Sequence, residues 1–313
     1  MSKILVAGSI AYDHLMTFDG EFKDSLLAGK DLKNLSVSFL ANSENFSFGG
    51  CAPNICYSLS LLGDSSSIVG IAGVDFPRYE KWLNEKGIGT DFIRVDQVGV
   101  TAAAYVLTDK NQGQITIFYP GVINDKKLGF DLGKFDPREY KYSIVSPELP
   151  DRMYYWAKHF KESGIPYIFD PGQAIPALTK EQLLEMSHES NAMIFNEYEG
   201  SLIESKLGIS FEELAKNKDF MVKTLGMRGC QVYAGEIFNI PAIPNLKEVD
   251  STGCGDAFRA GVLHGITNGF DLKRACEMGN TVASFVIGER GTQNHYYTME
   301  VFMDRLVKNY GEA

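Results

Sequence analysis

The stretch Val249-Asp250-Ser251-Thr252-Gly253-Cys254-Gly255-Asp256-Ala257-Phe258-Arg259-Ala260-Gly261 decides how the rest of the chain is interpreted. Two glycines flank one small residue, a carboxylate follows at once, and apolar residues continue at helical spacing as far as Ile266. This pattern predicts a tight turn followed by the start of a helix. Without side chains at Gly253 and Gly255, backbone N–H groups can converge on one point. The positive end of the helix dipole adds to them, so the turn suits an anion such as a phosphate.

Asp256 would then lie beside that anion. A carboxylate there can accept the proton of a hydroxyl that attacks phosphorus, which is the general-base role in phosphoryl transfer. The alternative is a glycine-rich turn in which Asp256 only stabilises the helix N-terminus, and spacing alone favours neither interpretation. The stretch is not a P-loop, because no Gly-Lys-Ser/Thr follows the glycines, and Phe258 replaces the third glycine of a dinucleotide fingerprint.

Composition excludes several classes of protein. A chain of 313 residues, 44% of them hydrophobic, can bury a large core, and its net charge of −10 argues against nucleic-acid or anionic-membrane partners. The N-terminus turns polar again too soon for a signal peptide, and no apolar run is long enough to span a membrane. Five cysteines without zinc-type spacing indicate reduced thiols. We therefore expect a cytoplasmic protein.

From Tyr140 onward, strand-like and helical stretches alternate. Strands are expected at 142–145, 167–169, 192–195 and 221–224, helices around 151–163, 179–187, 197–206 and 211–218, and a hairpin over 229–241. Such alternation predicts a mostly parallel sheet with helices on both faces. Lys3 to Ile10 predicts a buried first strand, and Asp13 follows where open α/β sheets bind ligands. Its two carboxylate oxygens could accept from a diol such as that of ribose, although an Asp that closes a turn is the simpler alternative.

Two segments fit this alternation poorly. Ser36 to Leu40 has the pattern of a half-exposed strand, and residues 101–108 and 114–119 predict a β-hairpin. These pieces could pair into a small lid that excludes water from the ligand, or they could extend the edge of the main sheet. With the lid interpretation, the large domain comprises residues 1–12, 48–98 and 122–313, and the lid comprises residues 13–47 and 99–121.

Two further motifs offer polar groups at helix starts. Phe48 to Gly63 predicts a helix opened by Gly49 and Gly50, whose backbone, with the Asn54 amide, could bind a hydroxyl group. Asn196 and Glu199 have the spacing of a capping box, which is the better explanation from the residues alone. The functional alternative is that Asn196 and Glu199 arrange Mg²⁺, through water, and the phosphates of a donor.

Together these motifs resemble those of the ribokinase (PfkB) family of small-molecule kinases. The family's C-terminal signature is Asp-Thr-x-Gly-Ala-Gly-Asp, with Cys254 here in place of alanine, and Asn196 to Glu199 resembles its Asn-x-x-Glu motif. Phe48 to Gly63 is similar to its N-terminal signature, and the motifs occur in the family's order over nearly the whole chain. The resemblance implies a ribokinase-like three-layer α/β/α sandwich with a mostly parallel central sheet and a small β-sheet lid.

The resemblance also implies roles for individual residues. Asp256 would be the base, and the amides of Gly253, Cys254 and Gly255 would stabilise the charge on the transferring group. ATP would contact Asn196, Thr224, Gly226, Gly229 and Asn280. Glu199 would act on Mg²⁺ indirectly, through water.

The sequence does not decide whether the protein is a homodimer or needs a monovalent cation such as K⁺ near Asp250 and Thr252. Because Cys254 begins a helix, we expect the pKa of an accessible thiol there to be lowered.

Within the family the similarity is greatest to bacterial adenosine kinases. It is carried by Gly8 to Met16, Ser38 to Leu40, Phe118 to Gly121, Asp170 to Gln173 and Gly291 to Gln293. Aromatic residues of the lid suit a purine, since stacking is worth ~1–3 kcal/mol per base. The amide of Gln173 can both donate to and accept from adenine. The expected substrate-binding residues are Ser9, Asp13, Ser38, Gly49, Gly50, Asn54, Phe118 and Gln173.

These residues predict transfer of the ATP γ-phosphoryl group to the 5′-hydroxyl of adenosine, giving AMP and ADP. A kinase of ribose, fructose or another nucleoside is the alternative within the same family, since it would share the catalytic residues. A catalytically silent adenosine- or sugar-binding sensor is the alternative of another class. Ala102-Ala103-Ala104 departs from relatives that carry an aromatic residue on this lid strand, so the base pocket can differ.

Overall fold

The computed structural model describes residues 3–27, 37–111, 113–124 and 135–312. Its strands are β1 (Lys3–Ala7), β2 (Ala11–Phe18), β3 (Ser43–Gly49), β4 (Ser65–Ala72), β5 (Gly89–Val95), β6 (Ala102–Asp109), β7 (Gln114–Tyr119), β8 (Tyr140–Val145), β9 (Tyr167–Phe169), β10 (Ala192–Asn196), β11 (Phe220–Thr224), β12 (Cys230–Ala234) and β13 (Glu236–Ile240). Its α-helices are α1 (Phe22–Leu27), α2 (Cys51–Leu61), α3 (Pro77–Glu85), α4 (Pro150–Glu162), α5 (Lys180–Glu189), α6 (Glu197–Leu207), α7 (Phe211–Ala215), α8 (Cys254–Thr267), α9 (Leu272–Val286) and α10 (Met299–Tyr310). Among these helices, none is both long and apolar enough to cross a bilayer.

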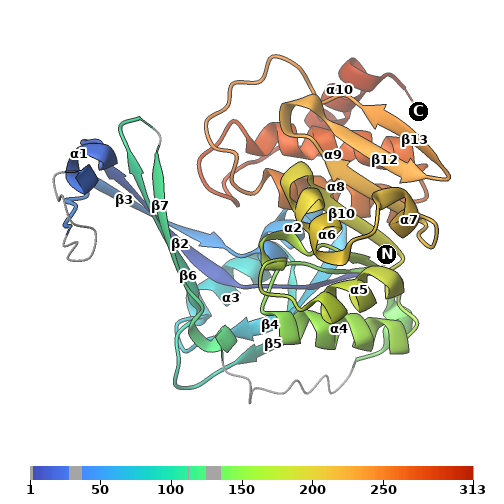
Figure 1. Ribbon diagram of the computed structural model, residues 1–313, viewed down its shortest axis with the longest axis horizontal. Helices are drawn as coiled ribbons and strands as arrows, with labels where there is room; N and C mark the ends of the chain where they lie inside the picture. Colours follow the sequence, from blue (N-terminus) through green and yellow to red (C-terminus); the bar gives the residue numbers. More distant parts are fainter. Residues whose placement is uncertain (1–2, 28–36, 112, 125–134, 313) are drawn as a thin grey trace.

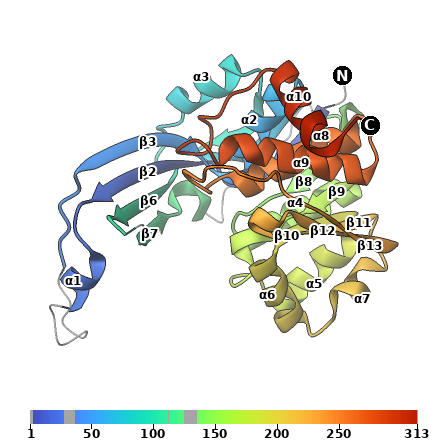
Figure 2. The ribbon, with the colours of Figure 1, turned by 90° about the horizontal axis from the view of Figure 1, so that it is seen from above.

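A nine-stranded sheet forms the centre of the molecule (Figure 1). Its order is β13-β12-β11-β10-β9-β8-β1-β4-β5, parallel from β11 to β5 and antiparallel at β12 and β13. Successive side chains of a strand point to opposite faces, so Ile4 and Val6 enter the core beneath α2, α3, α8 and α9. Leu5 and Ala7 enter the core beneath α4 to α7 instead. The expected three-layer architecture is confirmed (Figure 2), and so are the alternating strands and helices after Tyr140.

A second, four-stranded sheet in the order β3-β2-β6-β7 projects from the main body (Figures 1 and 2). The expected hairpin is β6 and β7, and β2 pairs with β6 in parallel. The sheet is therefore a separate one and not an extension of the main sheet. The domain boundaries given above stay a proposal, which the separate strand pairing supports.

Two details of the expected N-terminal region are wrong. The first strand ends at Ala7, and Asp13 lies within β2 of the small sheet, where it pairs with Ser47 and Ala104. The lid strand expected at 36–40 is instead β3, at Ser43–Gly49, whereas Val37 to Leu40 forms no strand. Ser36 itself lies outside the described residues. Phe39 packs its ring against Phe18 and Phe22, with centroids 5.2 Å away in each case, and this tertiary contact takes the place of strand pairing.

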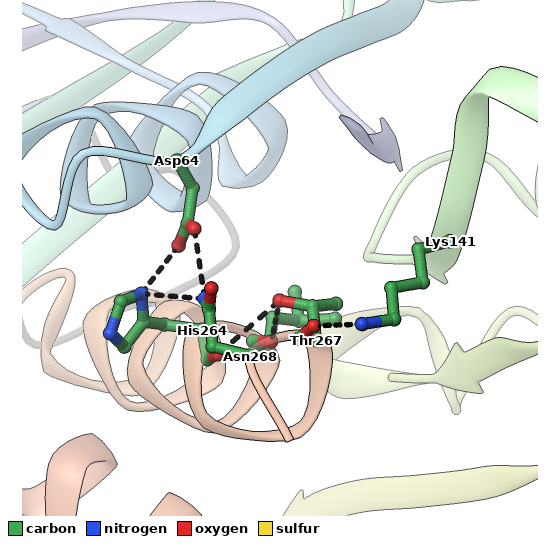
Figure 3. A network of polar contacts seen from close by, with 6 residues as sticks. Asp64, Lys141, His264, Thr267 and Asn268 are labelled. Atoms are coloured by element: carbon green, nitrogen blue, oxygen red, sulfur yellow. Dashed lines mark hydrogen bonds and ion pairs between the residues drawn. The ribbon is translucent and has the colours of Figure 1, made fainter. Parts of the chain in front are cut away.

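Helix α8 is fixed to the rest of the fold at its C-terminal end (Figure 3). His264 Nδ1 lies 2.7 Å from Asp64 Oδ2, and the Asn268 amide donates to Asp64 Oδ1 at 3.1 Å. Lys141, on β8, donates to the carbonyl oxygen of Thr267, where the helix leaves carbonyls unpaired. These contacts tie α8 to the α2–β4 connection and to the central sheet, so the opposite, N-terminal end of α8 has a fixed position at the sheet edge.

We predict that Gly261→Ala destabilises the protein, although helix propensity alone would favour this substitution. Alanine is normally favoured over glycine inside a helix by about 1 kcal/mol. A Cβ at Gly261, however, would lie 2.6 Å from the Cα of Gly279 on α9. Overpacking of this kind costs about 1–3 kcal/mol, so thermal unfolding should show a lower midpoint. Gly288→Ala is the control, because its nearest atom would be 3.9 Å away. A raised midpoint for Gly261→Ala would mean that α8 and α9 do not depend on this close approach.

Candidate active site

The turn before α8 has the geometry expected of an anion site. Gly253 is the N-cap residue with φ of 81°, a conformation that favours glycine, and no side chain caps the helix. The first N–H groups of a helix have no partner within it, so this end of α8 suits an anion. The Cys254 N–H donates to the carbonyl oxygen of Ser251 at 3.2 Å, and this bond closes the turn.

Asp256 lies in the first turn of α8 with its carboxylate held on one side. Asn54, on α2, donates from Nδ2 to Asp256 Oδ2 at 2.9 Å. Gln293 fixes the orientation of that amide, because its Nε2 donates to Asn54 Oδ1 at 3.0 Å. Among the described residues, Asp256 Oδ1 accepts no hydrogen bond, so it is available to a ligand. Burial raises the pKa of Asp256 to about 6, although Arg259 and the Asn54 hydrogen bond oppose the shift.

A cavity of about 690 Å³ joins most of the expected site residues. It lies where the C-terminal ends of the central strands, the start of α8 and the small sheet come together. The expected residues that line it are Ser9, Asp13, Gly50, Asn54, Phe118, Gln173, Asn196, Glu199, Thr224, Gly226, Gly253, Cys254, Gly255 and Asp256.

Asp13 reaches this cavity from β2 and lies against Gly49. A Cβ at Gly49 would be 2.2 Å from Asp13 Oδ2, so a side chain there would displace the carboxylate from this position. Burial, and next the charge of Asp256, raise the pKa of Asp13 to about 7. Gly49 does not itself line the cavity, and its contribution is the space that it gives to Asp13.

Some expected residues lie elsewhere. Ser38 is exposed and does not line the cavity, so its role stays a prediction. Gly229 and Asn280 line a second cavity of about 220 Å³, which Thr224, Gly226, Cys254 and Gly255 also border. The Asn280 amide donates to the Pro241 carbonyl at 3.1 Å, which fixes its side chain against the hairpin. The two cavities therefore share the end of β11 and the turn before α8, Ser251 to Gly255, which we call the anion turn.

Asn196 and Glu199 form the complete capping box that the residues alone favoured. Glu199 N donates to Asn196 Oδ1 at 2.8 Å, and Asn196 N donates to Glu199 Oε2 at 2.7 Å. Both residues also line the larger cavity. In the part of the chain that the structure describes, no three His, Cys, Asp or Glu side chains cluster to hold a metal directly. The residues present would therefore fit a cation only if phosphate and water supplied most of its ligands.

The sequence analysis missed an ion pair in the cavity wall. Arg259, one turn after Asp256 on α8, donates from Nη2 to Asp170 Oδ1 at 2.6 Å, and its Nε contacts Asp170 Oδ2. Both side chains are almost fully buried. The signal was a single arginine within the apolar run of α8, since a charged side chain on a buried helix face needs a partner.

Residues 7–299 match the pfkB family carbohydrate kinases. The chain belongs to this family. The nucleoside kinase of Methanocaldococcus jannaschii is 28% identical over 99% of this chain and 98% of its own length. Its crystal structure has a TM-score of 0.88 and covers 98% of this chain and 99% of the other. The nucleoside kinase of Burkholderia thailandensis, solved in complex with inosine, is 31% identical with a TM-score of 0.85, covering 99% and 98% of the two chains.

The family relation and the site agree. The protein is a kinase of the nucleoside and sugar kinase family, which transfers a phosphoryl group from ATP to an alcohol. The Asp256 carboxylate and the uncapped start of α8 border one cavity, an arrangement that suits such a transfer.

A lowered thiol pKa was expected at Cys254 only for an accessible sulfur, and the structure does not meet this condition. Cys254 is half-buried, and burial raises its pKa to about 12, helped by the charges of Asp250, Glu248 and Asp256. These effects outweigh the helix N-terminus, because a thiolate would be both desolvated and repelled.

We therefore predict slow alkylation of Cys254 by iodoacetamide at pH 8. Only the thiolate reacts, and little of it forms three to four units below the pKa. Mass spectrometry of the Cys254 peptide should show labelling that is at least about tenfold slower in the native protein than in urea. Cys254→Ala should keep turnover, since the turn uses the backbone at this position. Equal labelling rates in the native and the unfolded protein would contradict the raised pKa.

Proposed function

We propose that the protein transfers the γ-phosphoryl group of ATP to the 5′-hydroxyl of a purine nucleoside, with adenosine as the preferred acceptor. The observation that carries the proposal is the Asp256 carboxylate, which has one oxygen held by Asn54 and the other free, at an uncapped helix start in one cavity with Asp13. A sensor would not need a free base at this place.

The chemistry follows from the positions of these groups. Asp256 Oδ1 accepts the proton of the 5′-hydroxyl as its oxygen attacks phosphorus. The N–H groups at the start of α8 stabilise the negative charge of the transferring group without reorganisation, because the helix fixes them. Asp13, beside Gly49 and Gly50, accepts hydrogen bonds from the ribose diol, and the resulting orientation brings the 5′-oxygen to Asp256.

The rest of the cavity suits a base better than a sugar alone. Its wall includes the apolar side chains of Ala104, Phe118, Ile123, Pro147, Leu149, Pro150, Ala174 and Ala177. Phe118 pairs with Ala104 across β6 and β7, so its ring has a small neighbour, and the residue as a whole is 53% exposed. Within the described part of the chain, the Gln173 amide makes one long hydrogen bond, from Nε2 to Cys51 Sγ at 3.7 Å, which leaves most of the amide for a base edge. Inosine is the second candidate, because a related kinase binds it and an amide complements a 6-oxopurine as well.

The donor site is proposed in the second cavity and its border with the first. That cavity is lined by Thr224, Gly226, Gly229 and Asn280. If the adenine of ATP bound there, the phosphates of ATP would extend toward Gly255, in the turn that both cavities share. Mg²⁺ would be carried by the phosphates and water near Glu199 and would supply charge neutralisation. Each oxygen of Asp250 accepts one backbone N–H group, from Thr252 or Gly291, and each keeps a lone pair that could face a K⁺ ion.

We predict a higher kcat/KM for adenosine than for ribose or fructose. Stacking on Phe118 should contribute ~1–3 kcal/mol, which is roughly five- to 150-fold. Phe118→Ala should therefore lower kcat/KM for adenosine by that factor and leave the weaker activity with ribose unchanged. Coupled ADP-release assays over nucleosides and sugars provide the measurement. Better turnover of a free hexose would overturn the nucleoside assignment but not the family.

We predict that Asp256→Asn lowers kcat about 10²- to 10⁴-fold, with little change in adenosine affinity, because asparagine cannot accept the proton. Asp271→Asn is the matched control: Asp271 caps the start of α9 through the Arg274 N–H, outside either cavity. Asparagine caps helices as well as aspartate does, so the control should keep turnover and thermal midpoint. Near-normal kcat in Asp256→Asn would remove this residue from the mechanism.

The same base predicts the pH dependence. Asp256 acts as a carboxylate, and its pKa of about 6 is above the ordinary value. The kcat/KM should therefore rise with pH through about 6, since the protonated form present at lower pH cannot act as a base. Protonation of Asp13, with its pKa of about 7, would weaken the diol contact and broaden the same limb. A kcat/KM that stays constant down to pH 4.5 would contradict a raised pKa for the base.

A further inference from the structure

The larger cavity has a strongly unbalanced charge. Its described lining contains one cationic side chain, that of Arg259, against five carboxyl groups: Asp13, Glu148, Asp170, Glu199 and Asp256. A nucleotide phosphate would add more negative charge to the same space. In a cavity of low dielectric, such crowding disfavours every ionised carboxylate, including a base that has to be ionised to act.

Arg259 is held so that one guanidinium nitrogen faces the anion turn at Gly255. Asp170 takes Nη2 and Nε, whereas Nη1 has no hydrogen-bond partner among the described residues. That third nitrogen lies 2.8 Å from the position that a Cβ at Gly255 would occupy. Gly255 immediately precedes Asp256, and Arg259 follows Asp256 by three residues on the same helix face. Glycine at 255 is thus what allows the guanidinium to approach the turn.

We propose that Arg259, clamped by Asp170, is a positioning residue of the phosphoryl-transfer site that keeps Asp256 ionised for its role as base. The inference rests on the proposed function. It assigns a task to a residue pair that touches neither reacting atom. Asp170 holds two of the guanidinium nitrogens, and its negative charge offsets part of the positive charge that Asp256 receives.

The alternative is that Arg259 exists only to neutralise Asp170. A buried ion pair is weak support for stability, since well-packed apolar residues often replace it without loss. The pair would then need no particular place, yet it lies in the cavity wall with Nη1 directed at the glycine of the anion turn. The pKa values agree with the proposal: Arg259 is the largest influence that lowers the pKa of Asp256 against its burial.

The other charged groups around Asp256 work in the opposite direction. Asp13 from β2 and Asp170 from the end of β9 both feel the charge of Asp256, and Glu199 on α6 raises its pKa. The thiols of Cys51 and Cys254 are neutral, because burial raises their pKa values. The Asn54 amide lowers the pKa of Asp256 through its hydrogen bond, but it brings no charge. Only Arg259, among the described groups in this set, supplies a positive charge.

The two halves of the ion pair should therefore have opposite effects. Arg259→Gln removes the cation, which should raise the pKa of Asp256. The acidic limb of the kcat/KM profile should therefore move to higher pH, by roughly one to three pH units for loss of a nearby opposite charge. Asp170→Asn removes a carboxylate and leaves the cation, so the acidic limb should move to lower pH. Arg259→Lys keeps the charge and should keep the limb near its original position. If the pair were purely structural, Arg259→Gln and Asp170→Asn would both lower the thermal midpoint, and neither would move the acidic limb.

The matched control is the buried pair Arg274–Glu277 on α9, joined at 3.0 Å and outside both cavities. Arg274→Gln should destabilise the protein to a similar degree without moving the limb. The proposal is overturned if Arg259→Gln and Asp170→Asn shift the limb in the same direction, or if neither differs from Arg274→Gln. Should Arg259→Gln not fold, Arg259→Lys and Asp170→Asn decide between the same outcomes.

A second measurement separates this inference from the proposed function. Carboxyl ¹³C NMR titration reads the pKa of Asp256 without any turnover, and Asp256→Asn identifies its resonance. Opposite pKa shifts in Arg259→Gln and Asp170→Asn would support the charge role even if no nucleoside were phosphorylated. Unchanged pKa values in an active kinase would instead overturn the role of Arg259 and leave the proposed function intact.

Discussion

Under the proposed function, a carboxylate has to stay ionised inside a cavity crowded with other carboxyl groups, and this is the constraint on which the rest of the structure depends. Burial alone would neutralise Asp256, because an unpaired charge in a low-dielectric site is costly. The fold opposes this with a hydrogen bond from Asn54 and the nearby charge of Arg259. The resulting pKa is intermediate, close to the pH at which a base is both ionised and able to hold a proton.

These two supports come from distant parts of the chain. Asn54 lies 202 residues before Asp256, and Asp170 lies 89 residues before Arg259. Only the central sheet brings such segments together, since α2 and α8 cover one face and the C-terminal end of β9 reaches the same edge. The contacts of Asp64 and Lys141 at the other end of α8 prevent the helix from sliding, which would move Asp256 away from Asn54.

Local signals made the fold and much of the site predictable. Alternating strands and helices, the capping box at Asn196 and the glycine turn at Gly253 each depend on neighbours within a few residues. What the sequence did not reveal depends on contacts across the fold. Phe39 packs on Phe18 and Phe22, so residues 37–40 form no strand despite their pattern. The partner of Arg259 and the burial that raises the pKa of Cys254 are likewise visible only in three dimensions.

The proposed function places chemistry and acceptor choice in different parts of the molecule. The anion turn and Asp256 belong to α8 on the central sheet, whereas Asp13, Ala104 and Phe118 reach the cavity from the small sheet. Because Ala104 leaves space opposite Phe118, the small sheet provides one stacking face and no tight enclosure for a base. In the proposed function, discrimination among purines would then have to come from hydrogen bonds such as those available to Gln173, since unpaired polar groups reject a wrong partner far more strongly than loose apolar contact does.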